Sequence, residues 1–113
     1  TERIRDIVTN SKEISRNLNI HVILLSQINR GVESRDNKRP SMSDLDGAGT
    51  IEAEADHVIN LYRPWVYDNS ANRETVELIV AKNRHGPYPE TVFAKFHGPT
   101  TKFTPDEANN TPF

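Results

Sequence analysis

Four consecutive apolar residues, numbers 22–25, limit the folds open to this chain more than any other stretch. They are followed directly by the polar residues Ser26 and Gln27. A strand with one buried face alternates apolar and polar residues, whereas an unbroken apolar run needs cover on both faces, as in parallel α/β sheets. The sequence therefore predicts a buried strand over residues 21–26, with Ser26 and Gln27 at its carboxyl end.

Gln27 is the first candidate site residue because of where this strand ends. In open parallel sheets, ligands bind at the carboxyl ends of the strands. A Gln side chain at that edge offers an amide donor and a carbonyl acceptor to a phosphate or to an attacking water. The alternative is that Ser26 and Gln27 merely begin a loop, and this stretch alone leaves both interpretations open.

The rest of the chain supplies one long helix and several more strands. Apolar residues recur at three- and four-residue steps over residues 2–18, with acidic residues early and basic residues late, which predicts an amphipathic helix ended by Asn19. Further strands are expected at residues 57–62, 74–82, 91–96 and 102–104, the second and third of these antiparallel. The polar tail 105–113 is expected to be disordered.

These elements define an α/β fold class, with a mixed parallel and antiparallel sheet and one long N-terminal helix. At least three of the strands need cover on both faces, and one substantial helix cannot provide it. At 113 residues the chain is about one domain, yet only 35% of its residues are hydrophobic, which is low for a self-sufficient core. Residues 1–104 are therefore expected to form part of a larger domain.

A basic loop and two glycines form a second group of candidates. Residues 29–44 are polar and indicate a long loop, and such loops inside a compact domain are usually functional or disordered. A basic loop beside a ligand edge could contact phosphates, although a solvated charge run is the alternative. The glycines permit close approach of the backbone to a ligand, although a plain turn is commoner. These candidates are Arg30, Arg35, Lys38, Arg39, Gly47 and Gly49.

Two cations at the end of the strand 74–82 form a third group. Alternate residues of a strand point the same way, so Lys82 and Arg84 converge on one target if the extended geometry persists. The alternative is ordinary solvation of two surface side chains.

Composition and missing motifs exclude several function classes. The net charge is −2, so no global basic field attracts nucleic acid. The chain has no Cys and its four His residues lie too far apart for a local zinc motif, so no metal site is predicted. Because no signal-peptide pattern or membrane-spanning apolar run is present, we expect a soluble, cytoplasmic protein without a membrane partner. No phosphate-loop motif occurs, so the chain cannot cradle a triphosphate by itself.

Several segments together resemble one protein family. In chain order they are SQINRGVE from Ser26, KRP from Lys38, SDL from Ser43, GTIE from Gly49, LYR from Leu61 and AKNRHGP from Ala81. Agreement of several segments in order and spacing is far more specific than any lone motif. Over residues 1–104 the chain resembles the replicative DNA helicases of DnaB type.

The resemblance implies the carboxyl-terminal half of a RecA-like ATPase domain. In that family the residue matching Gln27 senses the γ-phosphate, and those matching Lys82 and Arg84 reach the neighbouring subunit's nucleotide, so all three are expected to be catalytic and nucleotide-binding. The phosphate loop, the catalytic Glu and the magnesium-binding Asp belong upstream. The implied cofactors are ATP and Mg²⁺. The implied partners are single-stranded DNA and the subunits of a hexameric ring, with primase and a helicase loader as candidates.

The implied function is ATP-driven translocation on single-stranded DNA and duplex unwinding, but one segment departs from the family. The family usually reads Arg-Glu-Ser-Gly where this chain has residues 46–49, and that segment contacts DNA phosphates. Here Asp46 would repel a phosphate unless its charge is paired, while Gly49 could still offer its backbone amide. Two alternatives remain: a RecA-like ATPase acting on recombination or protein partners, and a non-catalytic binding module that lacks the ATPase half.

Overall fold

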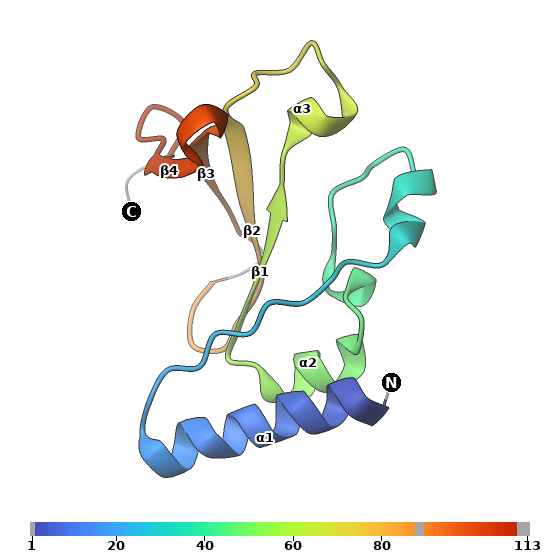
Figure 1. The fold of residues 1–113 in the computed structure, drawn as a ribbon, viewed down its shortest axis with the longest axis vertical. Helices are drawn as coiled ribbons and strands as arrows, with labels where there is room; N and C mark the ends of the chain where they lie inside the picture. Colours follow the sequence, from blue (N-terminus) through green and yellow to red (C-terminus); the bar gives the residue numbers. More distant parts are fainter. Residues whose placement is uncertain (1, 88–89, 111–113) are drawn as a thin grey trace. The chain divides into compact units, whose positions relative to one another are not determined.

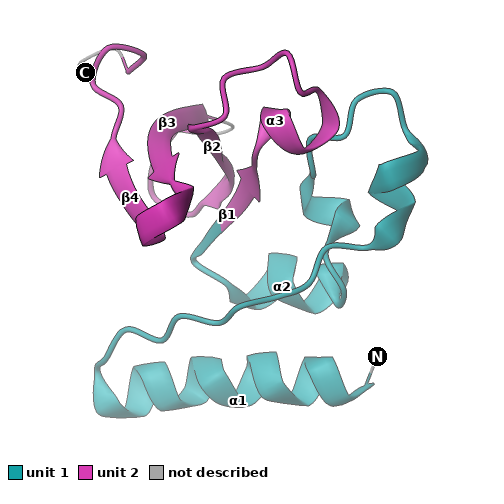
Figure 2. Cartoon of the chain, turned by 45° about the horizontal axis from the view of Figure 1, so that its top comes forward, with its two compact units in different colours: residues 1–58 teal, residues 59–113 magenta. Residues whose placement is uncertain are grey.

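The computed structural model describes residues 2–87 and 90–110. The chain divides into two compact units, Thr1–Val58 (unit 1) and Ile59–Phe113 (unit 2), which Figure 2 colours separately. Helices dominate unit 1, and most of the β-sheet belongs to unit 2.

Unit 1 begins with helix α1, Glu2–Leu18, which confirms the predicted amphipathic helix. Asn19 ends it in the left-handed conformation, with φ of 52°. The Ile20 amide then donates to the Ser15 carbonyl at 3.2 Å, which is the six-to-one hydrogen bond of a Schellman C-cap. Helix α2, Ala48–Glu54, lies along α1 (Figure 1). The sequence therefore determined both the extent of α1 and the way it ends.

The predicted strand over residues 21–26 is not formed. These residues follow an extended path without a strand partner, and the Ile23 and Leu25 side chains are 88% and 97% exposed. A central strand depends on neighbouring strands for its hydrogen bonds, and the strands in the described part of the chain pair only with one another. The apolar run is thus present without the sheet that would bury it.

The loop between residues 29 and 44 is more ordered than the sequence indicates. It contains two short 3-10 helices, η1 (Arg30–Ser34) and η2 (Met42–Asp44). The Asn29 side chain caps η1 by accepting a hydrogen bond of 2.8 Å from the Gly31 amide. Val32, within η1, is buried, as is Leu45 directly after η2, so both ends of the loop are anchored in the core of unit 1.

The sheet contains β1 (His57–Tyr62), β2 (Thr75–Asn83), β3 (Glu90–His97) and β4 (Lys102–Pro105), in that spatial order. These bounds confirm the four predicted strands to within about one residue at each end. β2 pairs antiparallel with β3, and β3 pairs antiparallel with β4. The parallel part of the predicted sheet is not confirmed, because it depended on the unformed strand before Gln27.

Two short helical turns link these strands. Helix α3, Pro64–Tyr67, begins directly after β1, where the sequence indicated only a loop. Pro at the first helical position suits this start because its missing N–H is not needed there. The turn η3, Gly98–Thr100, connects β3 to β4.

Residues after β4 pack against β3 as far as Asn110. The Asn110 side chain accepts a hydrogen bond from the Phe93 amide at 2.8 Å and donates one to the Phe93 carbonyl at 2.9 Å. Asp106 is buried and its amide donates to the same carbonyl at 3.4 Å. The structure thus differs from the expected disordered tail over residues 105–110, and residues 111–113 lie outside the described residues.

Gly47 is the position where a side chain would most disturb unit 1. Its φ is +77°, and a Cβ built on it would lie 2.5 Å from Ile4 Cγ2 of α1. We expect Gly47→Ala in the full-length protein to lower the free energy of unfolding by roughly 1–3 kcal/mol, because left-handed backbone disfavours a Cβ. Urea unfolding of the variant measures this loss.

Gly49→Ala is the matched control for this substitution. Gly49 lies within α2, and nothing stands within 4 Å of a Cβ built there. Ala is favoured over Gly in a helix by about 1 kcal/mol, so this change should be neutral or stabilising. Equal unfolding energies for the two variants would show that Gly47 is not required for its backbone conformation.

Candidate functional site

Gln27 lies beside Asp46, the first residue of the segment 46–49, and backbone hydrogen bonds hold it there. Ile28 and Leu45 form an isolated antiparallel bridge. On one side of it the Asn29 amide donates to the Asp44 carbonyl at 2.6 Å, and on the other the Asp46 amide donates to the Gln27 carbonyl at 3.2 Å. The backbones of Gln27 and Asp46 are therefore directly hydrogen-bonded.

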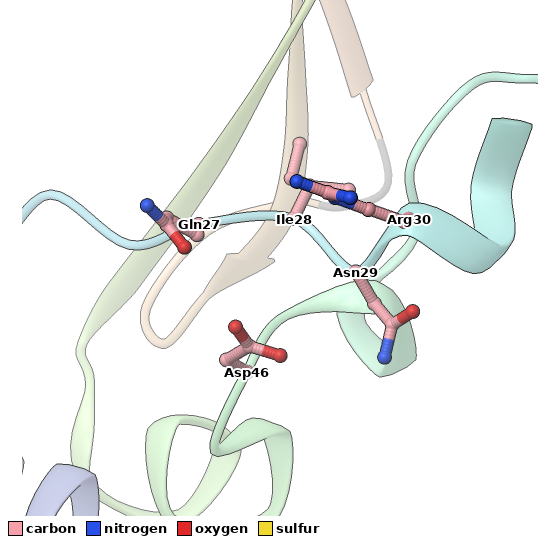
Figure 3. A pocket seen from close by; sticks show the side chains of 5 residues that line it. All are labelled: Gln27, Ile28, Asn29, Arg30 and Asp46. Atoms are coloured by element: carbon pink, nitrogen blue, oxygen red, sulfur yellow. The ribbon is translucent and has the colours of Figure 1, made fainter.

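This bridge borders an open hollow in unit 1, lined by Gln27, Ile28, Asn29, Arg30 and Asp46 (Figure 3). The side chains of Gln27, Asn29 and Arg30 are exposed, and Asp46 is half-buried. In Figure 3 the Asp46 carboxylate points toward the backbone of the 27–30 segment. The hollow thus offers amide donors and acceptors, one cation and one carboxylate to a ligand.

Asp44 joins the two halves of the basic loop through its carboxylate. Its two oxygens accept from the Arg35 guanidinium at 2.8 and 2.9 Å, and Oδ2 also accepts from the Ser41 amide at 2.7 Å. The hydrogen bond from Arg35, followed by that from the Ser41 amide, holds the pKa of Asp44 below its ordinary value. Asp44 therefore remains a carboxylate at neutral pH.

The predicted DNA-contacting cations differ in what they already bind. Arg35 pairs with Asp44, and Lys38 Nζ donates to the Arg35 carbonyl at 2.8 Å. Arg30 and Arg39 are exposed, and the Arg39 carbonyl accepts from Arg35 Nη2 at 3.1 Å. The sequence indicated one basic loop in which all four cations were equivalent. In the structure Arg35 differs from the others because it forms an ion pair with Asp44 of the same loop.

The two candidate glycines also differ in their structural roles. Gly47 caps α2 in the left-handed conformation against Ile4, so its conformation is needed by the fold. Gly49 lies in the first turn of α2, where it is exposed. Only Gly49 combines an exposed position with open space around it.

Lys82 and Arg84 lie at the end of β2 in unit 2. Lys82 is half-buried within the strand, but the strand ends at Asn83, and Arg84 belongs to the exposed turn that follows. The Gly86 amide closes this turn by donating to the Asn83 carbonyl at 3.3 Å. β2 is extended through Asn83, and the turn begins only at Arg84, so the convergence of the two cations on one target stays a prediction.

Sequence reasoning missed a stack of cations and aromatic rings in unit 2. The Arg63 guanidinium carbon lies 4.8 Å from the centre of the Phe96 ring, and that of Arg73 lies 4.7 Å from the centre of the Trp65 ring. Arg63 Nε is buried without a hydrogen-bond partner among the described residues. In the sequence, the only indication of this stack was that Trp65 follows the Leu-Tyr-Arg segment closely. Phe96 is distant in sequence, and only the tertiary fold brings it next to Arg63.

Two kinds of site do not occur in the part of the chain that the structure describes. No three His, Cys, Asp or Glu side chains there gather in an arrangement suited to a metal ion. Within the same residues, no helix combines the length and the apolar character needed to cross a bilayer.

Comparison with solved structures identifies the fold as part of a RecA-like helicase ATPase domain. It superposes on the ATPase domain of G40P with a TM-score of 0.88 and 40% identity, over 95% of this chain and 38% of that one. A DnaB-like replicative helicase, studied with its interactions with primase, gives a TM-score of 0.88 at 39% identity, over 94% of this chain and 26% of that one.

The chain belongs to the DnaB-like helicase C-terminal domain family, whose model matches residues 1–105. Among curated proteins, the replicative DNA helicase DnaC of Bacillus subtilis (strain 168) is 46% identical over 76% of this chain, and a probable replicative DNA helicase of Trieres chinensis is 42% identical over 90%. The chain spans 19% and 23% of those proteins. The resemblance seen in the sequence is confirmed.

Proposed function

We propose that this chain is the carboxyl-terminal half of the motor domain of a ring-forming replicative helicase, which couples ATP hydrolysis to movement along single-stranded DNA. The observation that carries the proposal is the backbone bridge between residues 27–29 and 44–46. In this proposal Gln27 senses the nucleotide state, and residues 46–49 form the DNA-facing segment. The bridge joins the two. Replicative DNA helicases at 40–46% identity support this assignment.

In this proposal the three catalytic candidates act on two nucleotides. Gln27 orients water or contacts the γ-phosphate in its own subunit. Lys82 and Arg84 neutralise charge on the phosphoryl oxygens of the neighbouring subunit's ATP, which requires a ring. ATP and Mg²⁺ are held mainly by residues outside this chain, so the isolated chain should neither bind ATP tightly nor hydrolyse it.

Contact with DNA would then rest on a smaller set of groups than the sequence indicated. Arg30, Arg35 and Arg39 are exposed, but Arg35 is paired with Asp44, which leaves Arg30 and Arg39 as the preferred cations. Gly49 can offer its amide. Asp46 weakens side-chain contact because a carboxylate repels phosphate. The proposed partners are single-stranded DNA, five further subunits in a hexamer, primase and a helicase loader, in the cytoplasm or another replication compartment.

One observation favours a second function. Asp46 gives the DNA-facing segment an acidic residue where the family is basic, which suits a RecA-like ATPase acting on recombination or protein partners. A non-catalytic binding module is the third candidate. An upstream phosphate loop in the same reading frame would exclude that module.

Strand displacement separates the helicase from the second candidate. The full-length protein should separate a forked DNA duplex when ATP and magnesium are present and fail with a non-hydrolysable analogue. The measurement is release of a labelled strand over time. ATP hydrolysis without any strand release would favour the recombination or protein-directed ATPase.

A further inference from the structure

We infer that Asp44 and Arg35 are positioning residues, whose ion pair holds the loop in the shape that lets Gln27 control the DNA-facing segment. The inference rests on the proposed function and adds to it. It also assigns Arg35 a role different from the phosphate contact that its charge indicates.

Asp44 is the centre of the contacts that close the loop. Its carboxylate accepts from both terminal nitrogens of Arg35 and from the amide of Ser41, and the Ser41 hydroxyl lies 3.1 Å from Oδ2. The Asp44 side chain is only 12% exposed. A charge-assisted bidentate pair of this kind is geometrically specific as well as strong, so it selects one loop conformation.

The backbone of Asp44 belongs to the bridge that reaches Gln27. Its carbonyl accepts from the Asn29 amide at 2.6 Å, and the next two residues pair with Ile28 and Gln27. Asp44 therefore closes the loop in two ways: its side chain binds Arg35 within the loop, and its main chain binds Asn29 at the base of the loop. Without the ion pair, only the few backbone hydrogen bonds would offset the entropy cost of closing the loop.

The edge of the Arg35 guanidinium formed by its two terminal nitrogens is already occupied. Nη1 and Nη2 both donate to Asp44, and Nη2 also donates to the Arg39 carbonyl at 3.1 Å. A DNA phosphate could bind this Nη1–Nη2 edge only by displacing a carboxylate that already matches it. The terminal nitrogens of this exposed basic residue are thus engaged within the loop itself.

Asp44→Asn distinguishes the two roles because one predicts a gain in DNA affinity and the other a loss of DNA-stimulated hydrolysis. If Arg35 contacts phosphate, removing the Asp44 charge frees a cation and removes a repulsive anion, so DNA should bind more tightly. If the pair positions the loop, the same substitution loosens the bridge and uncouples DNA from hydrolysis. The ratio of DNA-stimulated to basal ATPase rate should then fall, by at least about fivefold for a coupling energy of ordinary size.

The experiment compares Asp44→Asn, Arg35→Gln, Arg35→Lys and the double variant Asp44→Asn with Arg35→Gln in the full-length protein. Asp36→Asn is the matched control, because it removes the same charge from the same loop and Asp36 has no hydrogen bond or ion pair within the described ranges. We expect all three single changes at the pair to lower the stimulation ratio with basal rates retained, the double to be no worse than either single, and Asp36→Asn to keep it.

Arg35→Lys guards against an interpretation based on charge alone, since it retains the cation but cannot bind Asp44 bidentately. The salt dependence of oligo-dT binding should keep its slope in Arg35→Gln. A slope reduced by about 0.7, the value for one lost phosphate contact on a single strand, would overturn the inference, as would tighter binding by Asp44→Asn. Equal loss of basal and stimulated rates would also overturn it, because that indicates a merely structural pair.

Failure of the proposed function gives a different result. If the unsubstituted protein shows no stimulation by single-stranded DNA, the helicase proposal and this inference fall together. If it is stimulated and every variant keeps the same ratio, only the role of the Asp44 pair is wrong.

Discussion

Replacing Arg84 with alanine in the full-length protein is expected to slow ATP hydrolysis by roughly three orders of magnitude or more, the effect of removing an arginine finger. Arg84 lies in an exposed turn directly after β2. In the proposed ring its guanidinium would reach the ATP of a neighbouring subunit. The cation would neutralise charge that develops on the transferred phosphoryl group, so the turnover rate should fall much more than ATP affinity. Steady-state ATPase kinetics and separate nucleotide-binding titrations measure the two quantities.

Lys95→Ala is a suitable control for this change. Lys95 is an exposed cation of β3 in the same sheet, and its loss should leave the turnover rate nearly unchanged. Lys82→Ala should also lower turnover, since Lys82 stands two residues before Arg84. If Arg84→Ala keeps the normal maximal rate of ATP hydrolysis and only raises the KM for ATP, Arg84 contributes to ground-state binding and not to catalysis.

Gln27→Ala should lower DNA-stimulated hydrolysis by about two orders of magnitude, in the range found when one transition-state hydrogen-bond donor is removed. ATP binding should weaken far less, because Gln27 acts after the nucleotide is held. Gln27→Glu keeps the size of the side chain and loses its amide donor, so it should share the defect. The comparison is between the loss of stimulated rate and the loss of ATP affinity in each variant.

Ser26→Ala provides the adjacent control for Gln27. Ser26 is exposed and precedes the bridge, so its substitution should change neither quantity appreciably. If Gln27→Ala loses ATP affinity by as large a factor as stimulated rate, Gln27 is a binding residue and its coupling role is wrong.

Local patterns predicted the elements whose partners are close in sequence. The periodic apolar residues of α1 and the left-handed Asn19 required no distant information. The antiparallel pair β2 and β3 was predicted because a short connection joins the strands. In each case the stabilising contacts join residues that are close in sequence.

Elements that depend on distant partners could not be predicted. Residues 21–26 have the composition of a central strand, but composition does not supply the neighbouring strands that make one. Arg35 looked like a phosphate ligand because its carboxylate partner is nine residues away, whereas Arg30, Lys38 and Arg39 are closer in sequence. The contact of Arg63 with Phe96 joins residues of different elements, which only tertiary structure reveals.

Mixing two inactive variants tests most directly that this chain completes a neighbour's ATP site in a ring. One variant is Arg84→Ala with an intact phosphate loop, and the other has a disabled phosphate loop with Arg84 intact. At fixed total protein and with subunit exchange confirmed, the ATPase rate should rise to a maximum at intermediate mixing ratios, because some interfaces then pair an intact Arg84 with an intact nucleotide site. A flat, near-zero rate at every ratio despite proven exchange would contradict the account.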